Sequence, residues 1–414
     1  MNKEKEIYVY ADFLDHHCEP VGTIYVSESR GRETYAFEYE SSWLKQSDHF
    51  LDPDLQLYAG RQYVRDDKKI FGVFADSCPD RWGRLLMKRR EEIRAKATEE
   101  RPKKLLDSDF LTGVYDEARM GGLRFKTSRD GDFVSSDREY ATPPWTSLRE
   151  LEQASIKFEN EDDSLNEKWI KQLIAPGSSL GGARPKASVL APDGSLWIAK
   201  FPSKHDDFNS GAWEMVVHEL AKKCGLNVPE ARLEKFSKLG STFLIKRFDR
   251  EGSRRIHFSS AMTMLGKVDG DNRTEGSSYL EIVSFLKANG ATPKRDLEEL
   301  WKRIVFSMAV SNTDDHFRNH GFLLAEDGWT LSPMYDVNPD VYGEYLSLNI
   351  DDNDSVIDFE LAKDAATYYG LPVKQAEQGI ADIRAIVETN WAQLAKEFGI
   401  SRNEIERMRP AFRV

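Results

Sequence analysis

Two short stretches decide the fold: NTDDHFRNHG at residues 312–321 and SPMYD at residues 332–336. Asp314 and Asn319 stand five residues apart in the first stretch, and Asp336 ends the second. In a phosphoryl-transfer site, one carboxylate accepts the proton of the attacking hydroxyl, while an amide oxygen and a second carboxylate hold the magnesium that bridges the nucleotide phosphates. Asp314 suits the first role, and Asn319 and Asp336 suit the second. Asp315 is an alternative base, and register alone favours Asp314.

The segment between the two stretches predicts a hairpin. Residues 321–324 and 329–331 read as short strands around the turn at residues 326–328. Such a hairpin would return Asp336 toward Asn319. Taken alone, however, an Asp-x-x-x-x-Asn spacing occurs by chance in many chains, because Asp and Asn are common turn residues.

A second signature is SSLGGARPKASVL at residues 178–190. Adjacent glycines let backbone amides approach phosphate oxygens closely. The stretch is not a Walker loop, because Pro185 precedes Lys186 and a strand-like run follows where that motif needs Gly-Lys-Ser/Thr and a helix. It favours the Gly-rich hairpin that covers the phosphates in kinases, although a plain glycine turn is the alternative for this stretch taken alone.

The third element is a lysine on a strand. Lys200 lies in LWIAKF at residues 196–201 and could reach the phosphates, as the third-strand lysine of kinases does. A helix over residues 212–224 carries Glu214, a candidate ion-pair partner for Lys200, although an exposed helix charge is an equal alternative. The strand at residues 242–249 then leads to the expected adenine hinge. The glycine loop, the lysine strand and the Asp/Asn/Asp set occur in kinase order.

Composition points to an ordinary globular protein. The chain has 414 residues, of which 40% are hydrophobic, and a net charge of −12 from 58 basic and 70 acidic residues. This charge argues against a nucleic-acid coat or a membrane-surface protein. The three cysteines are far apart and form neither a metal cluster nor a disulfide framework, which suits a reducing cytoplasm. No apolar run approaches membrane-spanning length, so we expect a cytoplasmic protein without membrane association.

The sequence predicts three domains. Alternating runs over residues 7–75 indicate a β-rich module, a helix opens at residue 80, and residues 129–146 read as a linker, which places a boundary near residue 145. We therefore expect an N-terminal β-rich subdomain at 1–145, a kinase N-lobe at 146–249 and a helical C-lobe at 250–414. Apolar stripes over residues 297–308 and 380–398, with a capping-box spacing at 401–404, support the helical lobe.

Taken together, these motifs resemble the HipA toxin kinases of bacterial HipA-HipB toxin-antitoxin modules. The resemblance spans about residues 20 to 340. It is carried by SLGGARPK at 179–186, KRFDR at 246–250, NTDDHFRN at 312–319 and SPMYD at 332–336, with support from PDRWGR at 79–84 and HFSSAMT at 257–263.

The resemblance implies an α+β, two-lobed kinase-like fold with an N-terminal β-rich subdomain and a helical C-terminal lobe. It implies an ATP- and Mg²⁺-dependent serine/threonine-protein kinase with Asp314 as general base and with Asn319 and Asp336 as magnesium ligands. The expected nucleotide-binding residues are Gly181, Gly182, Ala183, Arg184, Pro185, Lys186, Lys200, Lys246, Arg247, Phe248, His316, Asn319 and Asp336.

The resemblance also implies regulation and partners. Family members can phosphorylate a serine of the glycine-rich loop, which corresponds to Ser179 here, with Ser178 adjacent. A dianionic phosphate there would compete with ATP for the loop amides. The expected partner is a small helix-turn-helix antitoxin that binds operator DNA, so that this acidic chain would meet DNA only through the antitoxin. The expected substrate is a translation factor such as an aminoacyl-tRNA synthetase.

Two other interpretations remain open from the sequence. A small-molecule or lipid kinase could use the same phosphate-handling residues, because a transfer site does not define the acceptor. A kinase-like co-repressor subunit could instead act only by binding an antitoxin on DNA. Retention of Asp314, Asn319, Asp336 and Lys200 argues against a purely structural role.

Overall fold

The structure is a computed structural model that describes residues 4–14, 17–46, 50–136, 141–161, 170, 173, 182 and 184–413. The chain divides into two compact units, Met1–Lys200 with Asp249–Ser259, and Phe201–Phe248 with Ser260–Val414. Both units mix helices with antiparallel strands, which confirms the expected α+β class. This division reflects the compactness of each part alone, so the expected domain bounds at residues 145 and 249 stay a prediction.

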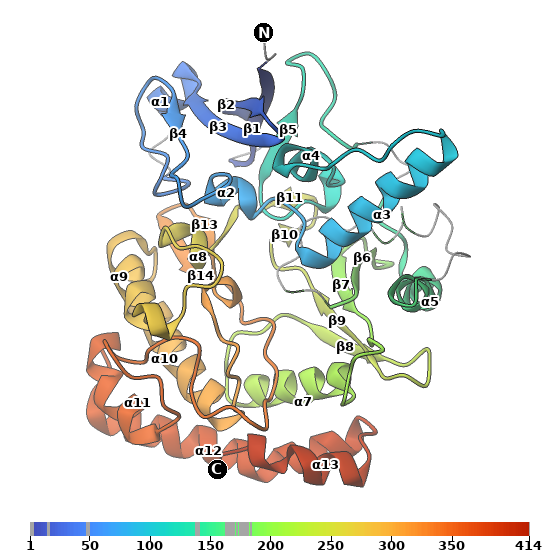
Figure 1. Cartoon of the computed structure of the whole chain (residues 1–414). Coiled ribbons are helices and arrows are strands. Elements are labelled where there is room, and N and C mark those ends of the chain that lie inside the picture. The colour runs from blue at the N-terminus through green and yellow to red at the C-terminus, as the bar shows by residue number, and fades with distance from the viewer. Residues whose placement is uncertain are drawn as a thin grey trace. The chain divides into compact units, whose positions relative to one another are not determined.

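The first unit opens with a five-stranded antiparallel sheet in the order β4-β3-β2-β1-β5 (Figure 1). Ile7, Val9 and Ala11 alternate along one strand and are fully buried, because successive side chains of a strand point to opposite faces. Ile7 lies opposite Ile24, which in turn lies opposite Phe37. The strands are β1 (Lys5–Leu14), β2 (His17–Ser29), β3 (Arg32–Tyr39), β4 (Gln62–Tyr63) and β5 (Leu123–Lys126).

Four of the α-helices that the structure describes in this unit lie between β3 and β5 in sequence, and a fifth follows β5. α3 starts where predicted, since the Asp80 side chain caps its first turn by accepting a hydrogen bond from the backbone N–H of Gly83 at 2.8 Å. The helices are α1 (Ser41–Gln46), α2 (Gly72–Ala75), α3 (Arg81–Ala97), α4 (Asp107–Thr112) and α5 (Leu148–Glu159). The hairpin of β6 (Lys186–Leu190) and β7 (Leu196–Lys200) confirms the two strands expected beside the glycine-rich stretch. The short strands β10 (Arg250–Glu251) and β11 (Arg254–Arg255) also belong to this unit.

The second unit carries most of the helices. Its elements are α7 (Ser210–Lys223), β8 (Ala231–Glu234), β9 (Thr242–Lys246), α8 (Ala261–Met264), α9 (Tyr279–Asn289), α10 (Pro293–Ala309), β13 (Gly321–Ala325), β14 (Gly328–Leu331), α11 (Phe359–Ala365), α12 (Val373–Glu397) and α13 (Arg402–Met408), and the last residue of β12 (Phe258–Ser260) also belongs to it. α12 packs against α7 and α10. Its predicted stripe is confirmed, because Ile383, Val387 and Trp391 are buried, and the helix ends before Gly399 at φ +73°.

The predicted hairpin between the two deciding stretches is also confirmed. β13 and β14 pair in register, with Phe322 opposite Leu331 and Ala325 opposite Gly328. α10 ends at Ala309, only a few residues before the first stretch, so a buried helix and a paired strand flank that stretch on either side. Within the described residues, no helix combines the length and the apolar character that crossing a bilayer requires.

Candidate active site

The loop from Asp314 to Asn319 closes on itself. The backbone carbonyl of Asp314 accepts hydrogen bonds from the His316 N–H at 3.0 Å and from the Asn319 side-chain Nδ2 at 2.8 Å. The Asn319 N–H donates to the His316 carbonyl at 2.8 Å, within the turn of 3-10 helix Phe317–Asn319. The spacing of five residues thus has a structural cause, since it lets the Asn319 amide bridge back to the start of the loop.

The orientation of the Asn319 amide is informative. Because Nδ2 is used within the loop, Oδ1 points the other way. This oxygen is buried and has no hydrogen-bond partner in the described part of the chain. A buried acceptor without a partner carries a desolvation penalty of roughly 1–3 kcal/mol. A hard cation would remove that penalty, since amide oxygens are among the ligands that Mg²⁺ accepts.

Asp314 and Asp315 have opposite environments. The Asp314 side chain is 89% exposed, and its Oδ1 lies 3.9 Å from His316 Nε2. The Asp315 side chain is 4% exposed; its carboxylate accepts the Tyr279 hydroxyl at 2.6 Å and lies 3.1 Å from His320 Nε2. Only Asp314 of the two is therefore accessible to an incoming hydroxyl group.

The pKa values of the two carboxyls move in opposite directions. Partial removal of water by the surrounding loop raises the pKa of Asp314, the charges of Asp336, Asp315 and nearby acidic groups raise it further, and His316 opposes them. Burial would also raise the pKa of Asp315, but the charge and contact of His320 and the Tyr279 hydroxyl outweigh burial and lower it.

Tyr335 connects the two deciding stretches. Its hydroxyl donates to the Arg318 carbonyl at 2.8 Å, directly before Asn319 in the chain. The next residue, Asp336, adopts a left-handed conformation at φ +56°. A non-glycine residue in this region stores backbone strain and is common at functional sites. The hydrogen bond and the turn at Asp336 therefore fix the stretch at residues 332–336 against the loop from Asp314 to Asn319.

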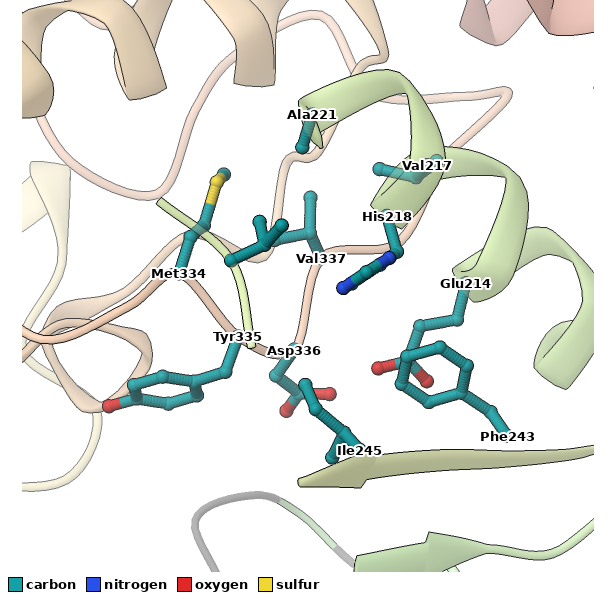
Figure 2. Close-up of a pocket in the computed structure, with 11 residues that line it drawn as sticks. Glu214, Val217, His218, Ala221, Phe243, Ile245, Met334, Tyr335, Asp336 and Val337 are labelled. Atoms are coloured by element: carbon teal, nitrogen blue, oxygen red, sulfur yellow. The ribbon is translucent and has the colours of Figure 1, made fainter. Parts of the chain in front are cut away.

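Figure 2 shows Asp336 and Glu214 reaching into one small cavity. Glu214 comes from α7 and is 5% exposed, so the alternative of an exposed helix charge is excluded. Phe243 and Ile245 of β9 and His218 of α7 line the same cavity. Lys200, the expected partner of Glu214, belongs to the other unit, and their ion pair stays a prediction.

A larger cavity of about 380 Å³ opens beside the exposed carboxylate of Asp314. Its lining also includes His316 and Arg318 from the loop and Arg273 and Ser347 from flanking segments. Further charged and amide side chains between residues 269 and 272 line it as well. Met262, Val268 and Phe317 add apolar surface, so the lining is mixed, with polar groups in the majority.

The expected hinge residues lie at the end of β9. The Phe248 ring packs on Tyr335, with ring centroids 5.6 Å apart. The Lys246 N–H donates to the Glu230 carbonyl at 2.8 Å, so this amide is already engaged, while the Arg247 side chain is buried. The structure thus brings Phe248 close to the Asp336 segment, and a bound base would meet groups other than the Lys246 amide.

The remaining predicted residues lie in the first unit. Lys200, Lys186 and Pro185 are buried, Arg184 is partly exposed and Gly182 is exposed. The expected residues Ser178, Ser179, Gly181 and Ala183 lie outside the described residues. The Lys186 ammonium donates to Asp80 at 2.7 Å, which the sequence did not predict.

The residues expected to hold magnesium fit that ion. Asn319 supplies a buried oxygen without a partner, and Asp336 supplies a carboxylate held by a strained turn. No group of three or more His, Cys, Asp or Glu side chains suited to a metal occurs in the part of the chain that the structure describes. Mg²⁺ does not require one, because it commonly uses one or two protein ligands together with substrate phosphates and water.

Sequence reasoning missed the residues that support the loop from a distance. Tyr279 and His320 hold Asp315, and Tyr335 holds the carbonyl of Arg318. Tyr279 precedes Asp315 by 36 residues, and no local pattern links the two. Tyr335 lies in SPMYD at residues 332–336, but the contact of its hydroxyl with the Arg318 carbonyl follows only from the fold.

Two family models match this chain. The sequence model of the HipA N-terminal domain matches residues 16–106, and that of the HipA-like C-terminal domain matches residues 178–391. A Sinorhizobium fredii protein named "Putative kinase Y4dM" is 26% identical over 308 residues, covering 66% of this chain and 69% of its own. A Haemophilus influenzae protein named "Putative kinase" is 25% identical over 266 residues, covering 57% of this chain and 71% of its own.

Among solved structures, the chain is similar to one from the Shewanella oneidensis MR-1 toxin-antitoxin system, solved as HipA, HipB and operator DNA. The TM-score is 0.63 at 17% sequence identity, covering 99% of this chain and 95% of the other. This likeness supports the expected kinase-like fold. Because the C-terminal domain model alone spans more than half of the sequence, the chain belongs to the HipA family.

Proposed function

We propose that this protein is an ATP- and Mg²⁺-dependent serine/threonine-protein kinase and the toxin of a toxin-antitoxin module. The single observation that carries the proposal is the Asn319 amide. Its nitrogen donates to the Asp314 carbonyl within the loop, and its buried oxygen has no hydrogen-bond partner among the described residues. The exposed carboxylate of Asp314 lies at the start of the same loop. The family relatives named as kinases agree with this proposal.

In this proposal Asn319 and Asp336 hold Mg²⁺, which when bound would neutralise charge on the nucleotide phosphates. Asp314 accepts the proton of the acceptor hydroxyl on one of its carboxylate oxygens. The raised pKa of Asp314 makes it a stronger base than an ordinary aspartate. Asp315 stays buried and ionised and fixes the loop backbone through Tyr279. Lys200 and the glycine-rich loop bind the phosphates, and the segment 246–248 receives the adenine.

The cavity beside Asp314 favours a polar acceptor. A lipid acceptor would need an apolar surface for its chains, whereas charged side chains such as Arg273 and Arg318 line this space. A serine or threonine in an extended polar segment of a protein suits it better. Following the family resemblance, we propose a translation factor such as an aminoacyl-tRNA synthetase as the substrate, and Ser179 or Ser178 as a site of self-phosphorylation.

We also propose a HipB-like helix-turn-helix antitoxin as the partner. The support is that the similar Shewanella structure contains HipA together with HipB and operator DNA. With a net charge of −12, this chain would approach DNA only through that partner.

The test is phosphate transfer from ATP labelled on its γ-phosphate to three classes of acceptor: serine peptides, lipids and sugars. We expect transfer to serine peptides by the wild type and none by Asp314→Asn. Asp327→Asn is the matched control, since Asp327 is an exposed aspartate in the β13–β14 turn. Transfer to lipids or sugars alone would instead support a small-molecule or lipid kinase. Absence of transfer and of ATP binding would favour the co-repressor interpretation.

A further inference from the structure

A buried ion pair connects two distant parts of the first unit. Lys186 Nζ lies 2.7 Å from Asp80 Oδ2, and the two side chains are 4% and 3% exposed. The same ammonium donates to the Gly182 carbonyl at 3.1 Å. Removing two charges from water is costly unless the geometry is good and further hydrogen bonds satisfy them. Lys186 meets this condition, so its ammonium joins the start of α3 to the glycine-rich stretch.

The first turn of α3 holds both partners of this ion pair in place. Asp80 Oδ1 accepts the Gly83 N–H at 2.8 Å, so the cap of α3 fixes the carboxylate. Trp82 Nε1 donates to the backbone carbonyl of Lys186 at 3.0 Å. The side chain and the backbone of Lys186 are therefore both bound to residues 80–82. A buried ion pair of this kind is best suited to fixing a register between two segments.

Lys186 also lies next to the lysine expected to reach the phosphates. In the β6–β7 hairpin, Lys186 is directly opposite Lys200. Directly opposite residues of an antiparallel pair project from the same face, with Cβ atoms about 5 Å apart. Two ammonium groups so placed repel each other. Asp80 neutralises Lys186, which lowers the electrostatic cost of keeping Lys200 charged at that site.

We propose that Asp80 is a positioning residue for nucleotide binding. It holds Lys186 as a clamp on the Gly182 carbonyl, which sets the end of the glycine-rich loop, and it screens Lys200 from the charge of Lys186. Lys186 then acts as a structural clamp and not as a direct phosphate ligand. This inference rests on the proposed kinase function, because it assigns a role within the same nucleotide site.

The test uses two variants and one control. Asp80→Asn keeps the shape of the side chain and its capping oxygen but removes the charge. Asp80→Asn combined with Lys186→Met removes both charges at similar volume, and it covers the case in which the single variant fails to fold. The matched control is Asp107→Asn, which breaks a different ion pair of α3, Arg84 to Asp107 at 2.8 Å.

Two readouts are measured for each protein: the Kd for MgATP by calorimetry and the amide hydrogen exchange of residues 182–190. In both test variants we expect the Kd to rise by about tenfold or more, and exchange near Gly182 to accelerate by a similar factor. The control should stay within about twofold of the wild type in both. If Lys186 instead bound phosphate directly, Asp80→Asn would leave affinity unchanged or strengthen it, and the exchange would not change.

A wild-type-like Kd and wild-type-like exchange in folded Asp80→Asn would overturn the proposal. If Asp80→Asn is unfolded, a wild-type-like Kd and wild-type-like exchange in the double variant would overturn the proposal. A wild type that binds no ATP would defeat the proposed function. In that case amide hydrogen exchange alone tests whether Lys186 holds the Gly182 carbonyl, because this measurement needs no nucleotide.

Discussion

Replacing Asp314 and Asp315 separately by Asn should have opposite consequences, although the two residues are adjacent. Asp314 is 89% exposed, whereas Asp315 is buried between Tyr279 and His320. We expect Asp314→Asn to abolish phosphate transfer without loss of stability. Asp315→Asn should lower the stability of the second unit first, and lower activity only as a result.

The magnitudes follow from these contacts. Asp315→Asn removes the carboxylate that lies 3.1 Å from His320 Nε2, and it weakens a 2.6 Å hydrogen bond from the Tyr279 hydroxyl. Weakening the contacts of a buried, ionised carboxylate costs about 3 kcal/mol in the free energy of unfolding. An exposed substitution such as Asp314→Asn usually changes that free energy by no more than about 0.5 kcal/mol.

The sign of the pH dependence gives a second readout. The pKa of Asp315 is lowered in the folded protein, so its stabilising contribution is present above the ordinary aspartate pKa and is lost as the pH falls through the folded value. Asp315→Asn should therefore lose stability at neutral pH and show a weaker further loss in acid. The assay is urea unfolding across this range, combined with phosphate transfer under native conditions.

One result would refute the reasoning. If Asp314→Asn lowered the free energy of unfolding by several kcal/mol while Asp315→Asn left it unchanged, the assignment of an exposed base and a buried support would be wrong. Retention of full transfer activity in folded Asp314→Asn would refute its role as the base.

Three further predictions concern other parts of the fold. Tyr335→Phe removes the hydrogen bond to the Arg318 carbonyl and should lower kcat/KM about tenfold; an unchanged value in steady-state kinetics would contradict this. Burial raises the pKa of Asp52 to about 6, so its contribution to stability is present at acid pH and lost as the pH rises through that value. In urea unfolding, the free energy of unfolding of the wild type should fall by about 3 kcal/mol as the pH rises from the ordinary aspartate pKa to about 6, and Asp52→Asn should abolish this fall. A fall that persists in Asp52→Asn would belong to another group. In Gly343→Ala, the new Cβ would lie 2.1 Å from Thr313 Cγ2, so phosphate transfer should fall. Adding Thr313→Ser to Gly343→Ala should restore part of the transfer. Equal transfer by the wild type, the single variant and the double variant would show that the site accommodates the methyl group without loss.

The elements that have a local cause could be predicted from the sequence. The alternating runs that begin at residue 7 predict strands, and in the structure Ile7, Val9 and Ala11 are buried along β1. The predicted Ser401 cap is confirmed, with its Oγ accepting the Glu404 N–H at 3.3 Å. The hairpin between Gly321 and Leu331 was also read correctly, because its turn residues and strand residues are adjacent in the chain.

The support of the site could not be predicted, because it depends on contacts between distant residues. Asp315 is hydrogen-bonded to Tyr279, which lies 36 residues earlier in the chain. Lys186 is hydrogen-bonded to Asp80, which lies 106 residues earlier. Neither pair has a spacing that a helix or a strand would impose. Lys186 is expected among the nucleotide-binding residues from the family resemblance, and only the fold reveals that its ammonium is bonded to Asp80.

The most direct test of the central claim is the intact mass of the purified protein after incubation with ATP and Mg²⁺, followed by peptide mapping. Asp314→Asn and Asp327→Asn are treated in the same way. The kinase account predicts one added phosphate on Ser179 or Ser178 in the wild type and in Asp327→Asn, and none in Asp314→Asn. A wild type that starts unphosphorylated, gains no phosphate and binds no ATP would contradict the account.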